Sequence, residues 1–121
     1  MSNNSFRFTS FNVYKNSKDF HHRIVLLTLK FPRNYWYLAD QLKRSALSVI
    51  LNIAEGSAKK SDAHFNRYLK ISLGSINETV ASLEICVEEK LLEQTDFDNL
   101  IAEATSIANQ LGGFSKSLKG F

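Results

Sequence analysis

The run from Gln41 to Gly56 constrains the fold more than any other part of the chain, because it is an uninterrupted helix-forming segment that is apolar around most of its circumference. Wound at about 100° per residue, its polar side chains share a strip roughly 100° wide, while its apolar side chains spread over roughly 220°. A helix at the corner of a small bundle buries an arc of only somewhat more than about 100°. This helix is therefore either central to the fold or covered on a second face by another subunit.

Length and composition place the chain among single-domain helical proteins. Its 121 residues can enclose one core but not two. One proline and five glycines are few, as expected for helices joined by short loops. The single cysteine, Cys86, excludes an internal disulfide and favours a reducing compartment. No apolar run approaches the roughly 20 residues that cross a bilayer, and the polar start lacks a signal-peptide pattern, so we expect a cytoplasmic protein with no membrane partner.

Four seams of apolar residues, spaced alternately by three and four positions, predict four helices. Pro32 ends the first of them, because the residue before a proline is disfavoured in the α region. Ser10, Ser61 or Asp62, and Thr95 are the expected N-caps, with Thr95 and Asp98 resembling a capping box. The expected helices span approximately residues 10–31, 34–58, 62–92 and 96–119.

Helices of this length with short connections predict an all-α, antiparallel up-down-up-down four-helix bundle. We place the bundle in one domain of residues 10–121, preceded by a flexible or extended segment of residues 1–9. Gly74 weakens the third helix by about 1 kcal/mol, which predicts the close approach of a neighbouring backbone there. The aromatic side chains of Tyr35, Trp36 and Tyr37 either close the end of the core or stack on nucleic-acid bases.

Motifs that would indicate catalysis are missing. The chain has no phosphate-binding loop, nucleophile elbow or His-Glu-x-x-His sequence. His21 and His22 diverge by about 100° on a helix and cannot hold a metal together from one face. Cys86 falls on an apolar seam and is interpreted as an inert core thiol. We therefore expect no enzymatic activity, no metal and no cofactor.

A polar strip on the second helix is the most informative group of side chains. Counting outward from the turn at Lys59 and Lys60 places Arg44 level with Glu78 of the third helix, which predicts an ion pair between them. Two interpretations remain open: a polar network that fixes the register of the two helices, or a groove for a ligand or partner. The residues of this predicted network are Arg44, Ser48, Asn52, Glu55 and Glu78.

The first two helices carry more apolar surface than the core of one bundle needs, and we assign the excess to an oligomer interface. The residues predicted to form this interface are Val25, Leu26, Leu29, Leu47, Ile50, Leu51 and Ala54.

Charge is divided unevenly along the chain, whose net charge is +3. Residues 1–70 hold 12 Lys and Arg against 4 Asp and Glu, and residues 71–121 hold 3 against 8. The basic half either pairs with the acidic half in the folded bundle or forms a surface for nucleic acid, whose affinity a ring of subunits would increase. The candidate nucleic-acid contacts are Lys15, Lys18, Arg23, Lys30, Arg33, Lys43, Lys59, Lys60, Arg67 and Lys70.

Several sequence motifs together resemble the 23S rRNA intervening-sequence proteins. The matching segments are Phe11-Asn-Val-Tyr14, Phe31-Pro32, Gln41-Leu-Lys-Arg-Ser-Ala-Leu-Ser48, Asn52-Ile-Ala-Glu-Gly56, Phe65 with Arg67-Tyr-Leu69, and Gly74-Ser75 with Glu78. This resemblance implies a homopentameric ring of antiparallel bundles, often encoded within inserts of ribosomal RNA genes, with no established molecular function. The family is similar in turn to the basic, pentameric accessory variability protein of diversity-generating retroelements, which implies nucleic acid and a nucleic-acid-processing protein as partners. Those accessory proteins are more uniformly basic than this chain.

Two functional hypotheses follow. The first is a non-catalytic homo-oligomeric scaffold, pentameric by resemblance, whose partner is another copy of itself. The alternative is an accessory factor that binds RNA through a basic face of the ring.

Overall fold

Four α-helices account for most of residues 6–118, the part of the chain that the computed structural model describes. Their bounds, with those of two short 3-10 helices, are η1 Arg7–Ser10, α1 Asn12–Thr28, η2 Arg33–Tyr35, α2 Trp36–Ser57, α3 Asp62–Glu88 and α4 Gln94–Ser117. No strand occurs within this described part. The all-α fold class predicted from the four seams is confirmed.

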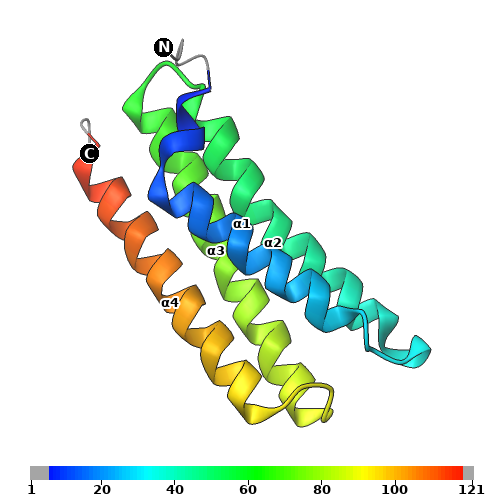
Figure 1. The fold of residues 1–121 in the computed structure, drawn as a ribbon. Coiled ribbons are helices and arrows are strands. Elements are labelled where there is room, and N and C mark those ends of the chain that lie inside the picture. The colour runs from blue at the N-terminus through cyan, green and yellow to red at the C-terminus, as the bar shows by residue number, and fades with distance from the viewer. Residues whose placement is uncertain (1–5, 119–121) are drawn as a thin grey trace.

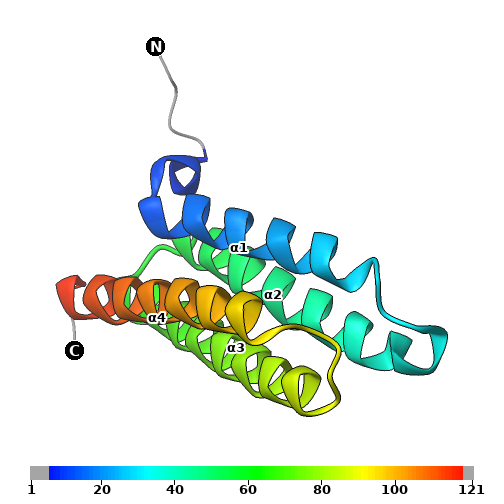
Figure 2. The same ribbon diagram turned by 60° about the horizontal axis from the view of Figure 1, so that its bottom comes forward.

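The helices form a four-membered ring in cross-section. Each helix packs against its neighbour in the chain, and α1 also packs against α4, whereas the backbones of the diagonal pairs, α1 with α3 and α2 with α4, do not approach as closely. Figure 1 shows the α2–α3 turn and both ends of the described chain at one end of the bundle, with the α1–α2 and α3–α4 connections at the other. Figure 2 shows that α1 lies over α2 and that α4 lies beside α3.

The predicted seams supply the core. Phe20 and Ile24 of α1, Leu42 of α2, Leu83 of α3 and Ile107 of α4 are all fully or almost fully buried. Cys86 is buried among them, and burial raises the pKa of its thiol to about 11. A protonated, inaccessible thiol is a poor nucleophile, which agrees with the interpretation of Cys86 as a core residue.

The N-terminal segment differs from its prediction. Residues 7–9, expected to be extended or disordered, form η1 together with Ser10, and residues 1–5 lie outside the described residues. Ser10 is not the N-cap of α1: its hydroxyl donates to the carbonyl of Arg7, and Phe11 occupies the cap position. Arg7 donates from Nε and Nη2 to the carbonyl of Ser57 at 3.2 and 3.0 Å, which attaches η1 to the C-terminus of α2.

Helix ends follow local hydrogen bonds that the seams do not reveal. α1 ends at Thr28, before the position that Pro32 predicts, and α3 ends at Glu88, where Lys90 adopts a φ of 63° and turns the chain. Ser61 is confirmed as the N-cap of α3, since its hydroxyl accepts from the backbone N–H of His64. The capping box at Thr95 is wrong, because α4 starts at Gln94, two residues earlier than predicted, with Glu93 at its N-cap.

The expected close approach of helices occurs at a different glycine. Outside its own helix backbone, no atom of the described chain lies within 4 Å of a Cβ built on Gly74, which is exposed, so no backbone of the same chain approaches there. A Cβ on Gly56 would instead lie 2.6 Å from Cβ of Tyr68 and 2.9 Å from Cδ1 of Phe65. Gly56 therefore lets α2 and α3 approach closely beside their turn, and α2 continues through it to Ser57.

The three aromatic residues at the start of the second helix separate. Tyr35 packs against the core, and its hydroxyl donates to Oε1 of Glu89 at 2.6 Å, which links the α1–α2 and α3–α4 connections. Trp36 and Tyr37 are 53% and 65% exposed, so the prediction that they close the end of the core is wrong for both. The Arg33 guanidinium lies over the Trp36 ring, 5.2 Å from its centroid.

Candidate interaction surfaces

The predicted polar network is only partly formed. Ser48 and Ser75 hydroxyls lie 2.8 Å apart across α2 and α3, and the Asn52 amide donates to the carbonyl and hydroxyl of Ser48 at 2.8 and 3.1 Å. Glu55 does not reach α3: its carboxylate pairs with Lys59 one turn along, at 3.1 Å. The network therefore contains two of its five predicted members, Ser48 and Asn52, together with Ser75.

Arg44 and Glu78 do not form the predicted ion pair. Both side chains are exposed, and neither has an ion-pair partner among the described residues. The two residues stand at corresponding heights, but each lies toward the outside of its own helix rather than toward the contact between them. They therefore do not fix the register of α2 and α3.

Buried hydroxyl groups hold that register instead, and sequence reasoning missed them. Ser72 Oγ donates to the carbonyl of Val49 at 2.9 Å, and Thr79 Oγ1 lies 2.8 Å from both Ser45 Oγ and the carbonyl of Ser75. These side chains are nearly or fully buried. The signal in the sequence is that Ser45, Ser72 and Thr79 fall on the apolar seams, where a hydroxyl needs a partner within the protein.

The predicted oligomer interface is largely exposed in the single chain. Leu26, Leu29, Leu47 and Leu51 are 51%, 75%, 41% and 55% exposed. Val25 and Ala54 are half-buried, whereas Ile50 is only 7% exposed and so has little surface left for a partner. The exposed leucines on these two adjacent helices are apolar surface that the single chain leaves uncovered.

The structure separates Leu26 from the rest of that set. Leu26 lies on the α4 side of α1, where it lines an open depression of about 290 Å³ with Leu27, Lys30, Asp96 and Leu100. The remaining exposed or half-exposed members we call the assembly face: Val25 and Leu29 of α1, and Leu47, Leu51 and Ala54 of α2.

An open depression of about 600 Å³ borders one end of the assembly face. Phe6 and Phe8 of the N-terminal segment line it together with Leu51, Ala54 and Glu55 of α2. Arg7 and Ser57 also line it, so its wall combines apolar side chains with polar ones.

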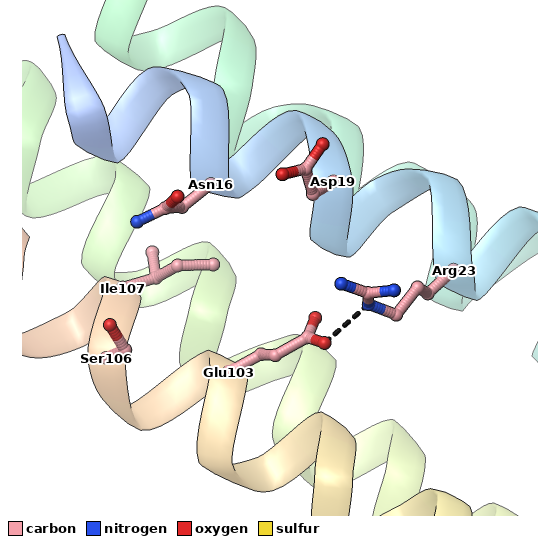
Figure 3. Close-up of a pocket in the computed structure, with 6 residues that line it drawn as sticks. All are labelled: Asn16, Asp19, Arg23, Glu103, Ser106 and Ile107. Carbon is pink, nitrogen blue, oxygen red and sulfur yellow. Dashed lines mark ion pairs between the residues drawn. The ribbon is translucent and has the colours of Figure 1, made fainter.

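A smaller hollow between α1 and α4 is polar (Figure 3). Asn16 and Asp19 border it on α1, and Arg23 donates from Nε to Glu103 of α4 at 2.5 Å. The hollow holds about 120 Å³. The ion pair joins α1 to α4. Arg23, one of the predicted nucleic-acid contacts, therefore already has a partner within the chain.

The fold sorts the predicted nucleic-acid contacts along the axis of the bundle. We call the half that contains residues 6–19, 48–74 and 106–118 the terminal half, since both ends of the described chain lie there, and the rest the loop half. Six of the ten contacts lie in the terminal half, namely Lys15, Lys18, Lys59, Lys60, Arg67 and Lys70; Arg23, Lys30, Arg33 and Lys43 lie in the loop half.

Acidic residues follow the opposite distribution. The terminal half has eight Lys and Arg against three Asp and Glu, whereas the loop half of the described chain has six against nine. The Arg23–Glu103 ion pair joins the basic and acidic halves of the sequence, whereas the Lys59–Glu55 pair lies within the basic half. The bundle has a basic end and an acidic end.

Histidine residues give no sign of metal binding. His21 is half-buried, and burial, followed by the charge of neighbouring His22, lowers the pKa of its imidazole. In residues 6–118, no three His, Cys, Asp or Glu side chains gather in a way that could hold a metal ion.

Within that same region, no helix is both long enough and apolar enough to cross a membrane.

Comparison with known proteins identifies similar chains. The model of a family described as 23S rRNA-intervening sequence protein matches residues 9–113. A crystal structure from Bacteroides thetaiotaomicron, described as a protein of unknown function from the S23 ribosomal protein family, superposes with a TM-score of 0.79 at 27% identity. The match covers 87% of this chain and 99% of that one. No curated protein matches significantly.

Proposed function

The chain belongs to the 23S rRNA-intervening sequence protein family, and from that premise we propose that it is a non-catalytic homo-oligomeric scaffold, a pentamer, that assembles through the assembly face of α1 and α2. The observation that carries this proposal is the exposure of Leu29, Leu47 and Leu51 on adjacent helices. Four helices already close a core without these side chains, so the core does not explain why they are apolar.

Burial of the exposed leucines would stabilise the assembly. Burial of a leucine side chain contributes about 1.5–3 kcal/mol, so covering the exposed half of one contributes about 1 kcal/mol. Each subunit of a ring presents its assembly face once and receives a neighbour once, which multiplies this contribution around the ring. Polar substitutions at these exposed positions should therefore weaken assembly while leaving the core of each subunit intact.

Light scattering on protein purified with nuclease tests the proposal. We expect the wild-type protein to have a mass of five times the 13.7 kDa of one chain. The Leu51→Glu variant should have the mass of a single chain, and its helical circular-dichroism spectrum should be unchanged. Ala102→Glu, at an exposed position of α4, serves as the matched control and should leave the mass unchanged. A wild-type protein that scatters as a monomer would overturn the proposal.

A second function, binding of RNA, is favoured by the axial separation of charge. In a ring whose subunits are related by rotation about an axis along the bundles, the basic ends of all subunits lie on the same side and their potentials add. Such a surface would bind a phosphate backbone with strong dependence on salt concentration. The expected sign is that protein purified without nuclease retains nucleic acid, visible in its ultraviolet absorbance ratio.

A further inference from the structure

α3 carries a second seam that the core does not use. Ile71, Gly74, Glu78, Ala81 and Ile85 follow one another at spacings of three, four, three and four, and all five are exposed. We call these residues the α3 stripe. Spacing of this kind places the side chains on one narrow face of a helix, as in the contact seam of a coiled coil. At about 1.5 Å per residue the stripe is about 21 Å long.

The composition of the α3 stripe is not that of a solvated surface. Ile71 and Ile85 are each 44% exposed, and they flank two small residues. Gly74 costs the helix about 1 kcal/mol relative to alanine, and no atom of the described chain outside its own helix backbone lies within 4 Å of its missing Cβ. Nothing inside the subunit explains this cost, whereas a neighbouring helix from outside could approach closely at Gly74 and Ala81.

The assembly face has the complementary composition. Leu47, Leu51 and Ala54 follow each other along α2 at spacings of four and three, and Lys43 lies one turn before Leu47, so this part of α2 has a length comparable to the α3 stripe. The exposed Asp40 lies about one turn further along in the same direction. The charges next to Leu47 are Lys43 and Arg44, both basic, and the single charge within the α3 stripe is Glu78. None of these three charged side chains has an ion-pair partner among the described residues.

We propose that the α3 stripe of one subunit docks on the assembly face of the next, with Glu78 facing Lys43 and Arg44 across the contact. This inference rests on the proposed homo-oligomer and states how its subunits join. A ring requires a heterologous contact between two different surfaces of each chain, whereas a surface that pairs with itself gives a two-fold dimer. The depression beside Leu51 and Ala54 accommodates an isoleucine of the incoming stripe.

Two single variants test the pairing. Leu51→Glu blocks the assembly face and leaves the α3 stripe intact, and Ile85→Glu does the reverse; both positions are substantially exposed, so each variant should fold. We expect each variant alone to sediment as a 13.7 kDa monomer and the equimolar mixture to form a dimer of twice that mass, because each partner supplies one intact surface. The protein concentration of the mixture should reach about the millimolar range, because a single contact binds more weakly than the several contacts of a closed ring.

The possible results separate this inference from the proposed function. If Ile85→Glu assembles like the wild type while Leu51→Glu is monomeric, the α3 stripe takes no part, and the inference is wrong while the proposed oligomer stands. If both variants are monomeric and their mixture is too, the two surfaces do not pair, and the inference is also wrong. A monomeric wild type would overturn both. Ala102→Glu mixed with either variant is the control for nonspecific association.

Discussion

At the scale of single residues, Ser17 stands out because its hydroxyl is the buried side-chain polar group without a hydrogen-bond partner in residues 6–118. The residue is 1% exposed. A buried polar group without a partner costs about 1–3 kcal/mol of stability, and alanine has nearly the same shape. We therefore expect Ser17→Ala to raise the free energy of unfolding by about 1 kcal/mol, measured by chemical denaturation.

Ser72→Ala is the matched control for that prediction. Ser72 is as buried as Ser17, but its hydroxyl donates to the carbonyl of Val49. Both substitutions gain the same small helix propensity, so the difference between the two variants reports the hydrogen bond. Ser72→Ala should lower the free energy of unfolding by about 1 kcal/mol. Equal effects of the same sign would contradict the assignment of Ser17 as unsatisfied.

At the scale of elements, α2 and α3 make the most extensive helix–helix contact of the bundle, and Gly56 allows their close approach beside the turn. Gly56→Ala would place a methyl group against the backbone-proximal Cβ of Tyr68, which cannot rotate away. We expect this substitution to lower the free energy of unfolding by about 1–3 kcal/mol, with a corresponding fall in the thermal midpoint.

Gly113→Ala in α4 is the comparison. A Cβ there meets no atom within 4 Å, so the substitution should stabilise the helix by up to about 1 kcal/mol. The two glycine variants therefore move the thermal midpoint in opposite directions. A stabilising Gly56→Ala would show that α2 and α3 can separate at their turn at little cost.

At the scale of the whole molecule, the opposite charge of the two ends of the bundle predicts where RNA would bind. Lys60→Glu combined with Lys70→Glu reverses two exposed charges at the basic end. Lys30→Glu combined with Lys90→Glu makes the same change in net charge at the acidic end. We expect the first pair to weaken binding of single-stranded RNA by roughly tenfold or more and to flatten its salt dependence, because phosphate contacts are lost.

Fluorescence anisotropy at two salt concentrations measures that difference. The second pair of substitutions should change the affinity much less, because long-range effects of net charge are screened beyond about 10 Å at 0.1 M salt. If both pairs of substitutions weakened RNA binding equally, the affinity would depend on the net charge of the protein rather than on the basic end. Absence of any salt-sensitive binding by the wild type would remove the RNA-binding alternative.

Much of the fold could be predicted because the seams repeat over many turns. A pattern such as Phe20, Ile24 and Leu27 is read from several residues at once, so errors at single positions do not change the assignment of a helix. Helix ends could not be predicted as well, since they depend on one or two hydrogen bonds. Ser61 is the N-cap that the sequence predicts for α3. The predicted N-caps Ser10 and Thr95 are replaced by nearby residues, Phe11 and Glu93.

Contacts between helices were harder to predict because they depend on rotation as well as height. Counting outward from a turn placed Arg44 and Glu78 at the same level but could not say that both lie toward the outside. For the same reason, the glycine at a close approach was assigned to Gly74 rather than Gly56. The α3 stripe was not predicted, although its spacing is visible in the sequence.

The sequence by itself determined that this chain forms four helices, which apolar seams bury one core, and that α1 and α2 have apolar surface to spare, because these properties follow from residue spacing along one helix. Only the tertiary structure decided that serine and threonine hydroxyls join α2 to α3, that Ile50 is covered while Leu51 is exposed, and that charge separates toward the two ends. The physical reason is that these properties depend on the rotation of each helix about its axis, which packing against its neighbours fixes.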